Sequence, residues 1–332
     1  MINMEYYSSF ISLAIFCLIL FVYLHIFFHI KTSNDLELYE ITPPSKDKLH
    51  EICDLKQPAM FKFYNKNIYD VFNLERLKNE YGSFDVNLRE INDNEGRLYF
   101  KLPYKVALEV FETEKEKKYY LENNYEFFKE TQLLNEFKSI DELLRPQMVC
   151  ECNYDLMIGT KNVTTPLRYT LENRHYLYCC ESSATVRLIP PNYSKYLYME
   201  NDYVNFEFRS KINPWNVEDE YKIDFDKCKY FDVDVTMGQI IYIPSYWLYS
   251  VKLSNNSNIL VFSYRTYMSS ISILPQLSMS LLQKYNVKEN RTETLNHYNP
   301  ENVDKISLDN KIDLSGNTNI EETTDDELSK VD

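Results

Sequence analysis

The segment that decides the fold reads MGQIIYIPSYW and runs from Met237 to Trp247. Gly238 stands two positions before four consecutive apolar residues, and Pro244, which has no backbone N–H to donate to a neighbouring strand, follows them. This arrangement is typical of a short buried strand between two turns. Comparable short runs, broken by Pro, Asn and Asp, occupy residues 175–180, 185–189 and 258–264. Their spacing predicts an antiparallel sandwich or jelly roll over residues 148–285.

The preceding part of the chain, residues 45–147, is charged and more compatible with helices. Apolar side chains recur at three- or four-residue spacing in residues 74–78 and 125–137, which predicts helices there. One early apolar strand is expected at residues 59–64. A closing helix is expected at residues 271–285. The body between the N-terminal run and the tail suits one large domain as well as two small ones.

An apolar run from Phe10 to Phe28 is long enough to cross a membrane. It contains no charged side chain, and as a helix it spans about 28 Å, close to the hydrocarbon thickness of a bilayer. A signal peptide would have a cationic start and a shorter apolar core. We therefore predict a transmembrane anchor over residues 1–30 and a juxtamembrane linker over residues 31–44. The lipid bilayer is then a partner, and Lys31 opposite Glu5 favours a cytosolic body.

The composition excludes two classes of protein. The chain has 332 residues with 36 Lys and Arg against 50 Asp and Glu, a formal net charge of -14. This acidic excess argues against a nucleic-acid partner, which requires a basic surface. The five glycines are too scattered to form a phosphate-binding loop. Residues 286–332 hold twelve acidic and five basic side chains, which predicts a disordered acidic tail.

Four motifs together resemble the cupin-like, jumonji-C family. They are Met-Ile-Gly at residues 157–159, Thr-Pro-Leu at 165–167, Pro-Pro at 190–191 and Gly-x-x-x-x-Ile-Pro-x-x-Trp at 238–247. The resemblance implies a double-stranded β-helix, mainly β with flanking helices. It also implies descent from iron(II)- and 2-oxoglutarate-dependent hydroxylases or demethylases. The anchor and the Asn- and Tyr-rich composition are similar to cupin-like proteins of giant DNA viruses, for which the membrane would be viral.

All four chemistry positions of that family carry other residues in this chain. The resemblance places Arg168 and Thr170 at the His and Asp of the iron site, and Tyr249 at the distal His. Glu181 falls at the Lys that binds 2-oxoglutarate. Arginine cannot ligate a cation because it stays protonated, and the hydroxyls of threonine and tyrosine are weak ligands. We therefore predict no metal, no cofactor and no catalytic residue.

The replacing residues suggest how the former pocket is filled. Arg168 and Glu181 would restore a balance of charge, so we expect them to form an ion pair. Tyr169 or Tyr249 would fill space beside them, with Trp247 as a further pocket residue. His175 lies five residues beyond Thr170, and we expect a structural histidine on the next strand and not a substitute ligand.

These residues favour a membrane-anchored cupin-like pseudoenzyme that acts as a binding or scaffold module for a protein partner. Two alternatives stay open. One is a sensor of anionic small molecules with Arg168 as the clamp, since arginine forms bidentate bonds to carboxylates and phosphates. The other is an iron(II)- and 2-oxoglutarate-dependent hydroxylase with an atypical site.

Overall fold

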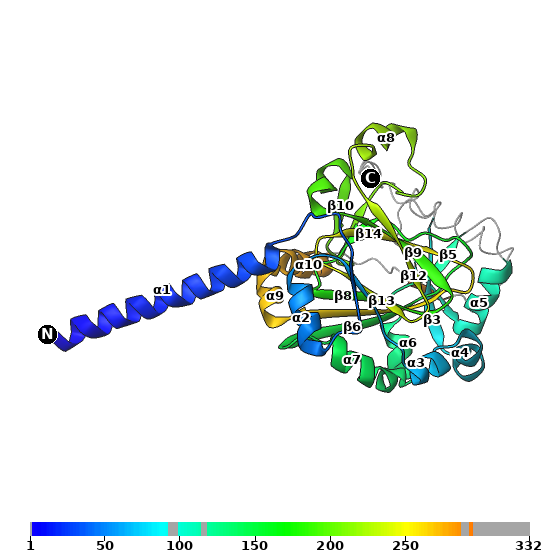
Figure 1. The fold of residues 1–332 in the computed structure, drawn as a ribbon, viewed down its shortest axis with the longest axis horizontal. Helices are drawn as coiled ribbons and strands as arrows, with labels where there is room; N and C mark the ends of the chain where they lie inside the picture. The colour runs from blue at the N-terminus through cyan, green and yellow to red at the C-terminus, as the bar shows by residue number, and fades with distance from the viewer. Residues whose placement is uncertain (1, 92–98, 114–117, 287–291, 295–332) are drawn as a thin grey trace, which may run out of the picture. The chain divides into compact units, whose positions relative to one another are not determined.

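A computed structural model describes residues 2–91, 99–113, 118–286 and 292–294. Figure 1 shows a long helix, α1 (Ile2–Ile30), that runs out from a body of strands with helices around them. Two six-stranded sheets form the centre of the body. The first has the order β1-β2-β13-β8-β15-β6. Its strands are β1 (Tyr39–Ile41), β2 (Ala59–Lys62), β6 (Val149–Met157), β8 (Arg174–Glu181), β13 (Gln239–Ile243) and β15 (Asn258–Thr266).

The second sheet has the order β10-β11-β7-β14-β9-β12. Its strands are β7 (Arg168–Tyr169), β9 (Ser183–Ile189), β10 (Met199–Asp202), β11 (Glu207–Ser210), β12 (Phe231–Thr236) and β14 (Leu248–Leu253). A smaller sheet has the order β16-β4-β3-β5 and is built mainly from the part of the chain that precedes β6. It consists of β3 (Asp85–Glu90), β4 (Tyr99–Pro103), β5 (Tyr119–Leu121) and β16 (Thr292–Thr294).

The main core lies between the two large sheets. In β9 and β12 of the second sheet buried and more exposed residues alternate, whereas β8, β13 and β15 of the first sheet are buried on both faces, because helices cover their outer side. Leu177 and Ile241 of the first sheet belong to the same buried cluster as Val186 and Val251 of the second. The mainly β fold with flanking helices is therefore confirmed, and the strands expected at residues 175–180, 185–189, 239–243 and 258–264 are present as β8, β9, β13 and β15.

Gly238 makes the turn between β12 and β13 possible. Its φ of +86° lies in the left-handed region, where residues with a Cβ are strained. Its N–H donates to the carbonyl of Cys179 and its carbonyl accepts from Phe63. The turn therefore ties β13 to its neighbours in the first sheet.

Helices cover the outer faces of the strands. The expected helix at residues 125–137 is interrupted, because Gln132 adopts a left-handed φ of 60° between α6 (Tyr125–Glu130) and a 3-10 turn (Leu133–Phe137). The closing helix is present as α10 (Leu274–Asn286), preceded by a short helix, α9 (Tyr267–Ser272). The helices of the body are α2 (Lys46–Asp54), α3 (Lys66–Val71), α4 (Leu74–Tyr81), α5 (Tyr104–Thr113), α6 (Tyr125–Glu130), α7 (Lys138–Leu144), α8 (Asp219–Phe225), α9 (Tyr267–Ser272) and α10 (Leu274–Asn286).

Short strands occur in both segments that were expected to flank the domain, residues 31–44 and the tail. The predicted linker, residues 31–44, contains strand β1, which pairs in parallel with β2 and so forms part of the first sheet. The prediction that residues 31–44 are only a linker is therefore wrong. Within the predicted tail, residues 292–294 form β16 beside β4. The other residues beyond position 286 lie outside the described part of the chain.

Helix α1 meets the criteria of a membrane span. Residues Tyr6–Ile30 form a 25-residue apolar helix whose most apolar window is not buried against the body. Only its C-terminal end touches the body, where α9 lies beside it and the Phe28 ring lies 5.2 Å from Lys56 Nζ. In the described part of the chain, one helix is thus long and apolar enough to cross a membrane.

Candidate functional site

A polar cavity of about 350 Å³ opens between the two large sheets, next to α10. Arg168 and Tyr249 are direct partners across β7 and β14, and both line it together with Thr170 and Tyr169. Three of the positions singled out by the family resemblance are therefore close in space. His175, on β8, also lines this cavity.

Two arginines and two glutamates form an ion-pair network at this cavity, which we call the Arg–Glu cluster (Arg89, Glu122, Arg168 and Glu207). The Arg168 guanidinium donates to Glu122 and lies 3.7 Å from Glu207. Arg89 donates to Glu122 at 2.5 Å and to both oxygens of Glu207 at 3.0 and 3.1 Å. Because each carboxylate contacts both arginines, the buried charges neutralise one another.

Glu122 is the centre of the cluster. Its side chain is only 4% exposed, and the hydroxyls of Tyr99 and Tyr120 also donate to it, each at 3.2 Å. Burial by itself would raise the pKa of this carboxyl, but Arg168 and Arg89 outweigh burial and lower the pKa to about 2. Glu122 is therefore a charged acceptor for four donors and not a proton donor or acceptor near neutral pH.

The predicted ion pair between Arg168 and Glu181 is wrong. Glu181 ends strand β8, and its carboxylate accepts the backbone N–H of Leu74 at 3.1 Å. It lies six residues along the strand from His175, roughly 20 Å away at the rise of an extended chain. The reason is the tight reversal at Ser182, with a φ of 61°, which places Glu181 at the far end of the β8–β9 hairpin.

Trp247 also lies away from the polar cavity. The ring is fully buried in the core between the sheets and makes an edge contact with Phe231 at 6.3 Å. The expectation that it lines the pocket is wrong, because residues 247, 249, 251 and 253 enter the core at successive depths and only Tyr249 reaches the cavity. Tyr169 does line it and stacks on Phe208, with ring centroids 5.2 Å apart.

His175 is buried on β8, the strand that follows Thr170, as expected of a structural histidine. Its Nδ1 lies 2.8 Å from the Ser263 hydroxyl, and its ring lies 5.1 Å from that of Tyr249. Burial, with the charge of Arg168, lowers the pKa of His175 to about 3. Its Nε2 has no hydrogen-bond partner among the described residues, so a neutral imidazole presents one unpaired nitrogen at the cavity wall.

The pKa of His175 predicts an acid-sensitive stability. As the pH falls, the unfolded chain protonates its imidazole near pH 6.5 while the folded protein does not, so the free energy of unfolding should drop by about 2 kcal/mol between pH 7 and pH 5. Urea unfolding measures the free energy of unfolding at pH 7 and at pH 5. In His175→Asn the drop between the two pH values should be about 2 kcal/mol smaller than in the wild-type protein. Ser263→Ala, which keeps the imidazole, should retain the full loss. An unchanged pH dependence in His175→Asn would contradict the assignment.

The residues of the cavity do not fit a ferrous ion. Such a site needs two imidazoles and a carboxylate on one face. Within the described ranges, no group of three His, Cys, Asp or Glu is arranged to hold a metal, and the cavity wall carries the Arg168 guanidinium, which cannot ligate a cation. Around the cavity, five carboxylates face three cations, an excess that disfavours a dicarboxylate. They are Glu122, Glu151, Asp155, Glu172 and Glu207, against Arg168, Arg265 and Lys284.

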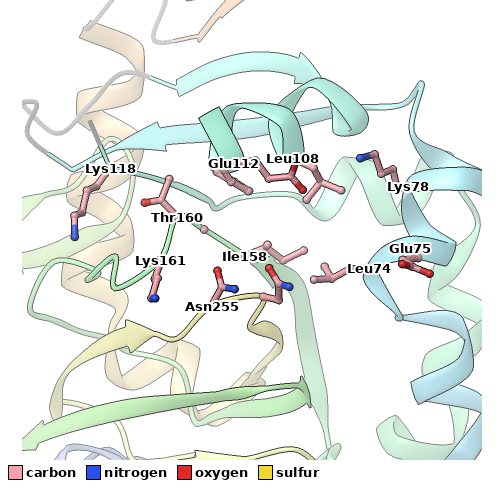
Figure 2. A pocket seen from close by; sticks show the side chains of 13 residues that line it. Leu74, Glu75, Lys78, Leu108, Glu112, Lys118, Ile158, Thr160, Lys161 and Asn255 are labelled. Atoms are coloured by element: carbon pink, nitrogen blue, oxygen red, sulfur yellow. The ribbon is translucent and has the colours of Figure 1, made fainter. Parts of the chain in front are cut away.

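A larger cavity, of about 730 Å³, lies at Gly159 and contains none of the family's chemistry positions. Figure 2 shows Lys118, Thr160 and Lys161 along one side of it, with Leu74, Glu75 and Lys78 on the other. Its charged side chains are of both signs, and a nucleophile with an adjacent base is not among its lining residues. The polar cavity is therefore the candidate site.

Comparison with known families agrees with this fold. A model of the cupin-like domain matches residues 37–266, a range that contains every strand of the two large sheets. The chain therefore belongs to the cupin-like domain family. A search of curated proteins gives no match. The likeness to proteins of giant viruses stays a prediction.

Proposed function

We propose that the protein is a membrane-anchored cupin-like pseudoenzyme whose body serves as a binding or scaffold module for a protein partner. The observation that carries the proposal is the engagement of Arg168 by Glu122 at the position where the family places a metal ligand. A guanidinium held there by a buried carboxylate occupies the ligand position with a positive charge, which repels a divalent cation.

The anchor supplies the membrane part of the proposal. Helix α1 has the length and apolarity for one crossing, and Lys31 at its C-terminal end favours a cytosolic body by the positive-inside rule. Of the other functions, the anionic sensor is disfavoured because the carboxylates of Glu122 and Glu207 already occupy the guanidinium of Arg168. An atypical hydroxylase would need ligands that the cavity does not supply.

Iron binding and 2-oxoglutarate turnover test this function. The full chain, purified in detergent, is incubated without oxygen with iron(II) and 2-oxoglutarate and then desalted, and bound iron is measured. After exposure to air, succinate is measured. We expect iron well below one equivalent and no succinate above a protein-free control. Stoichiometric iron together with succinate would refute the pseudoenzyme.

A triple variant tests whether residues 168, 170 and 249 stand at metal-ligand positions. Arg168→His, Thr170→Asp and Tyr249→His together put two imidazoles and a carboxylate on adjacent strands, since residues 168 and 249 are cross-strand partners. This triple variant should bind more iron than the wild-type protein. Equal iron in the two proteins would show that these residues do not stand at metal positions.

A further inference from the structure

A separate cavity of about 560 Å³ lies where helix α1 ends, and we call it the juxtamembrane cavity. One wall is the chain that leaves the helix, from Lys31 to Asp35. The other wall is the end of α2 and the residues after it, Asp54 to Gln57. The cavity therefore lies between the predicted membrane span and the cupin-like domain, and it takes no part in the polar cavity described above.

Lys56 is the unusual residue of this cavity. Its side chain is almost completely buried, with 4% of the residue exposed, yet its Nζ has no hydrogen-bond partner in the described part of the chain. The ammonium lies 5.2 Å from the centre of the Phe28 ring, and the Asp54 carboxylate also attracts it. A buried ammonium with three unsatisfied donors is costly, and a ring face replaces only part of its hydration.

The backbone of Lys56 adds a second cost. Its φ of 57° lies in the left-handed region that follows helix ends, where glycine and asparagine are favoured. Lysine at this position is therefore not explained by the turn. Burial, aided by Arg174, lowers the pKa of Lys56 to about 8. The ammonium is still mostly charged at neutral pH, so an anionic ligand beside it would offset the cost of its burial.

The acidic side chains of the cavity already have partners. Asp54 accepts from Arg174 at 2.7 Å. Asp35 accepts from Gln57 at 2.9 Å and from Ser33 at 3.1 Å. Lys31 and Lys56, in contrast, form none of the ion pairs found among the described residues. The cavity thus has two lysines in its wall that form no ion pair among the described residues, with the hydroxyl-bearing Thr32 and Ser33 beside them.

We propose that the juxtamembrane cavity binds the phosphate of an anionic phospholipid, with Lys31 and Lys56 as its cations. This proposal rests on the membrane anchor of the proposed function. Lys31 directly follows the span that ends at Ile30, which is the depth at which a bilayer carries its phosphates. Lysines close to an anionic membrane surface attract its lipids, and here the cavity would let one headgroup enter.

The test uses the full chain in detergent with an equimolar mixture of phosphatidylglycerol and phosphatidylcholine. Native mass spectrometry measures the lipid retained. We expect a preference for phosphatidylglycerol that falls about fivefold in Lys31→Gln and in Lys56→Gln. Lys161→Gln, in the remote cavity of Figure 2, should leave it unchanged. Lys31 is exposed, so its variant reports on binding even if Lys56→Gln folds poorly.

Three results would overturn the proposal. Equal retention of the two lipids is one, and an unchanged preference in both lysine variants is another. The third is full displacement of phosphatidylglycerol by glycerol 3-phosphate, which would assign the cavity to a soluble phosphate ester. Extraction of the protein from membranes at alkaline pH is measured separately. Release there would disprove the anchor, whereas the retention assay in detergent reports on the cavity itself.

Discussion

Replacing Glu122 by glutamine should lower the free energy of unfolding by about 3–5 kcal/mol, because the change leaves buried arginine charge without its partner. Arg89 and Arg168 both donate to Glu122, and their side chains are 2% and 14% exposed. After the substitution Arg89 keeps Glu207, while Arg168 keeps only the longer 3.7 Å contact to it. For a domain of this size the melting temperature should fall by roughly 6–20 °C.

This result is checked by measuring the melting temperature of the full chain in detergent, with far-ultraviolet circular dichroism as the readout. Glu126→Gln is the matched control, since Glu126 is 68% exposed in its pair with Lys129 and should change stability by less than about 0.5 kcal/mol. Replacing both partners, with Glu122→Leu and Arg168→Met, should be milder than Glu122→Gln alone. A Glu122→Gln protein that melts like the wild type would contradict the central place of Glu122 in the cluster.

Trp247→Ala should cost about 3–5 kcal/mol, because it opens a large hole in the core between the sheets. The ring is fully buried, and its Nε1–H finds no acceptor in the described part of the molecule. Trp247→Phe should therefore be much milder, since it fills most of the volume and removes an N–H that is unpaired there.

The two Trp247 variants show whether this side chain lies in the core or lines an open pocket. A residue lining an open pocket would lose little stability on truncation, whereas a core residue loses several kcal/mol. Chemical unfolding followed by the fluorescence of the other tryptophan, Trp215, measures both variants. If Trp247→Ala lowers the free energy of unfolding by less than about 1 kcal/mol, Trp247 lines a cavity and is not a core residue.

Much of the fold could be predicted from local patterns. A run of apolar residues before Pro244 and a glycine in a tight turn are enough to specify β13 and the reversal before it. The same holds for β8, β9 and β15, whose apolar runs are ended by turn residues. Strand β1 was not foreseen because it has only three residues and gains its stability by pairing with β2.

The candidate site was only half predictable. Spacing to Thr-Pro-Leu and to Ile-Pro placed Arg168, Thr170 and Tyr249 in one pocket, and the structure brings them together. The partner of Arg168 is Glu122 and not Glu181, because Glu181 lies at the far end of the β8–β9 hairpin. Glu122 stands 46 positions before Arg168 in a segment with no motif, and no local signal in the sequence points to it.

The sequence alone determined the apolar helix near the N-terminus and the short strands of the jelly roll. These features follow from hydrophobic periodicity and turn chemistry, which act over a few neighbouring residues. Only the tertiary structure decided that Glu122 neutralises Arg168, that Trp247 belongs to the core and that Lys56 is buried without a hydrogen-bond partner among the described residues. Each depends on strands and turns far apart in the chain meeting in space, where burial makes charge pairing decisive.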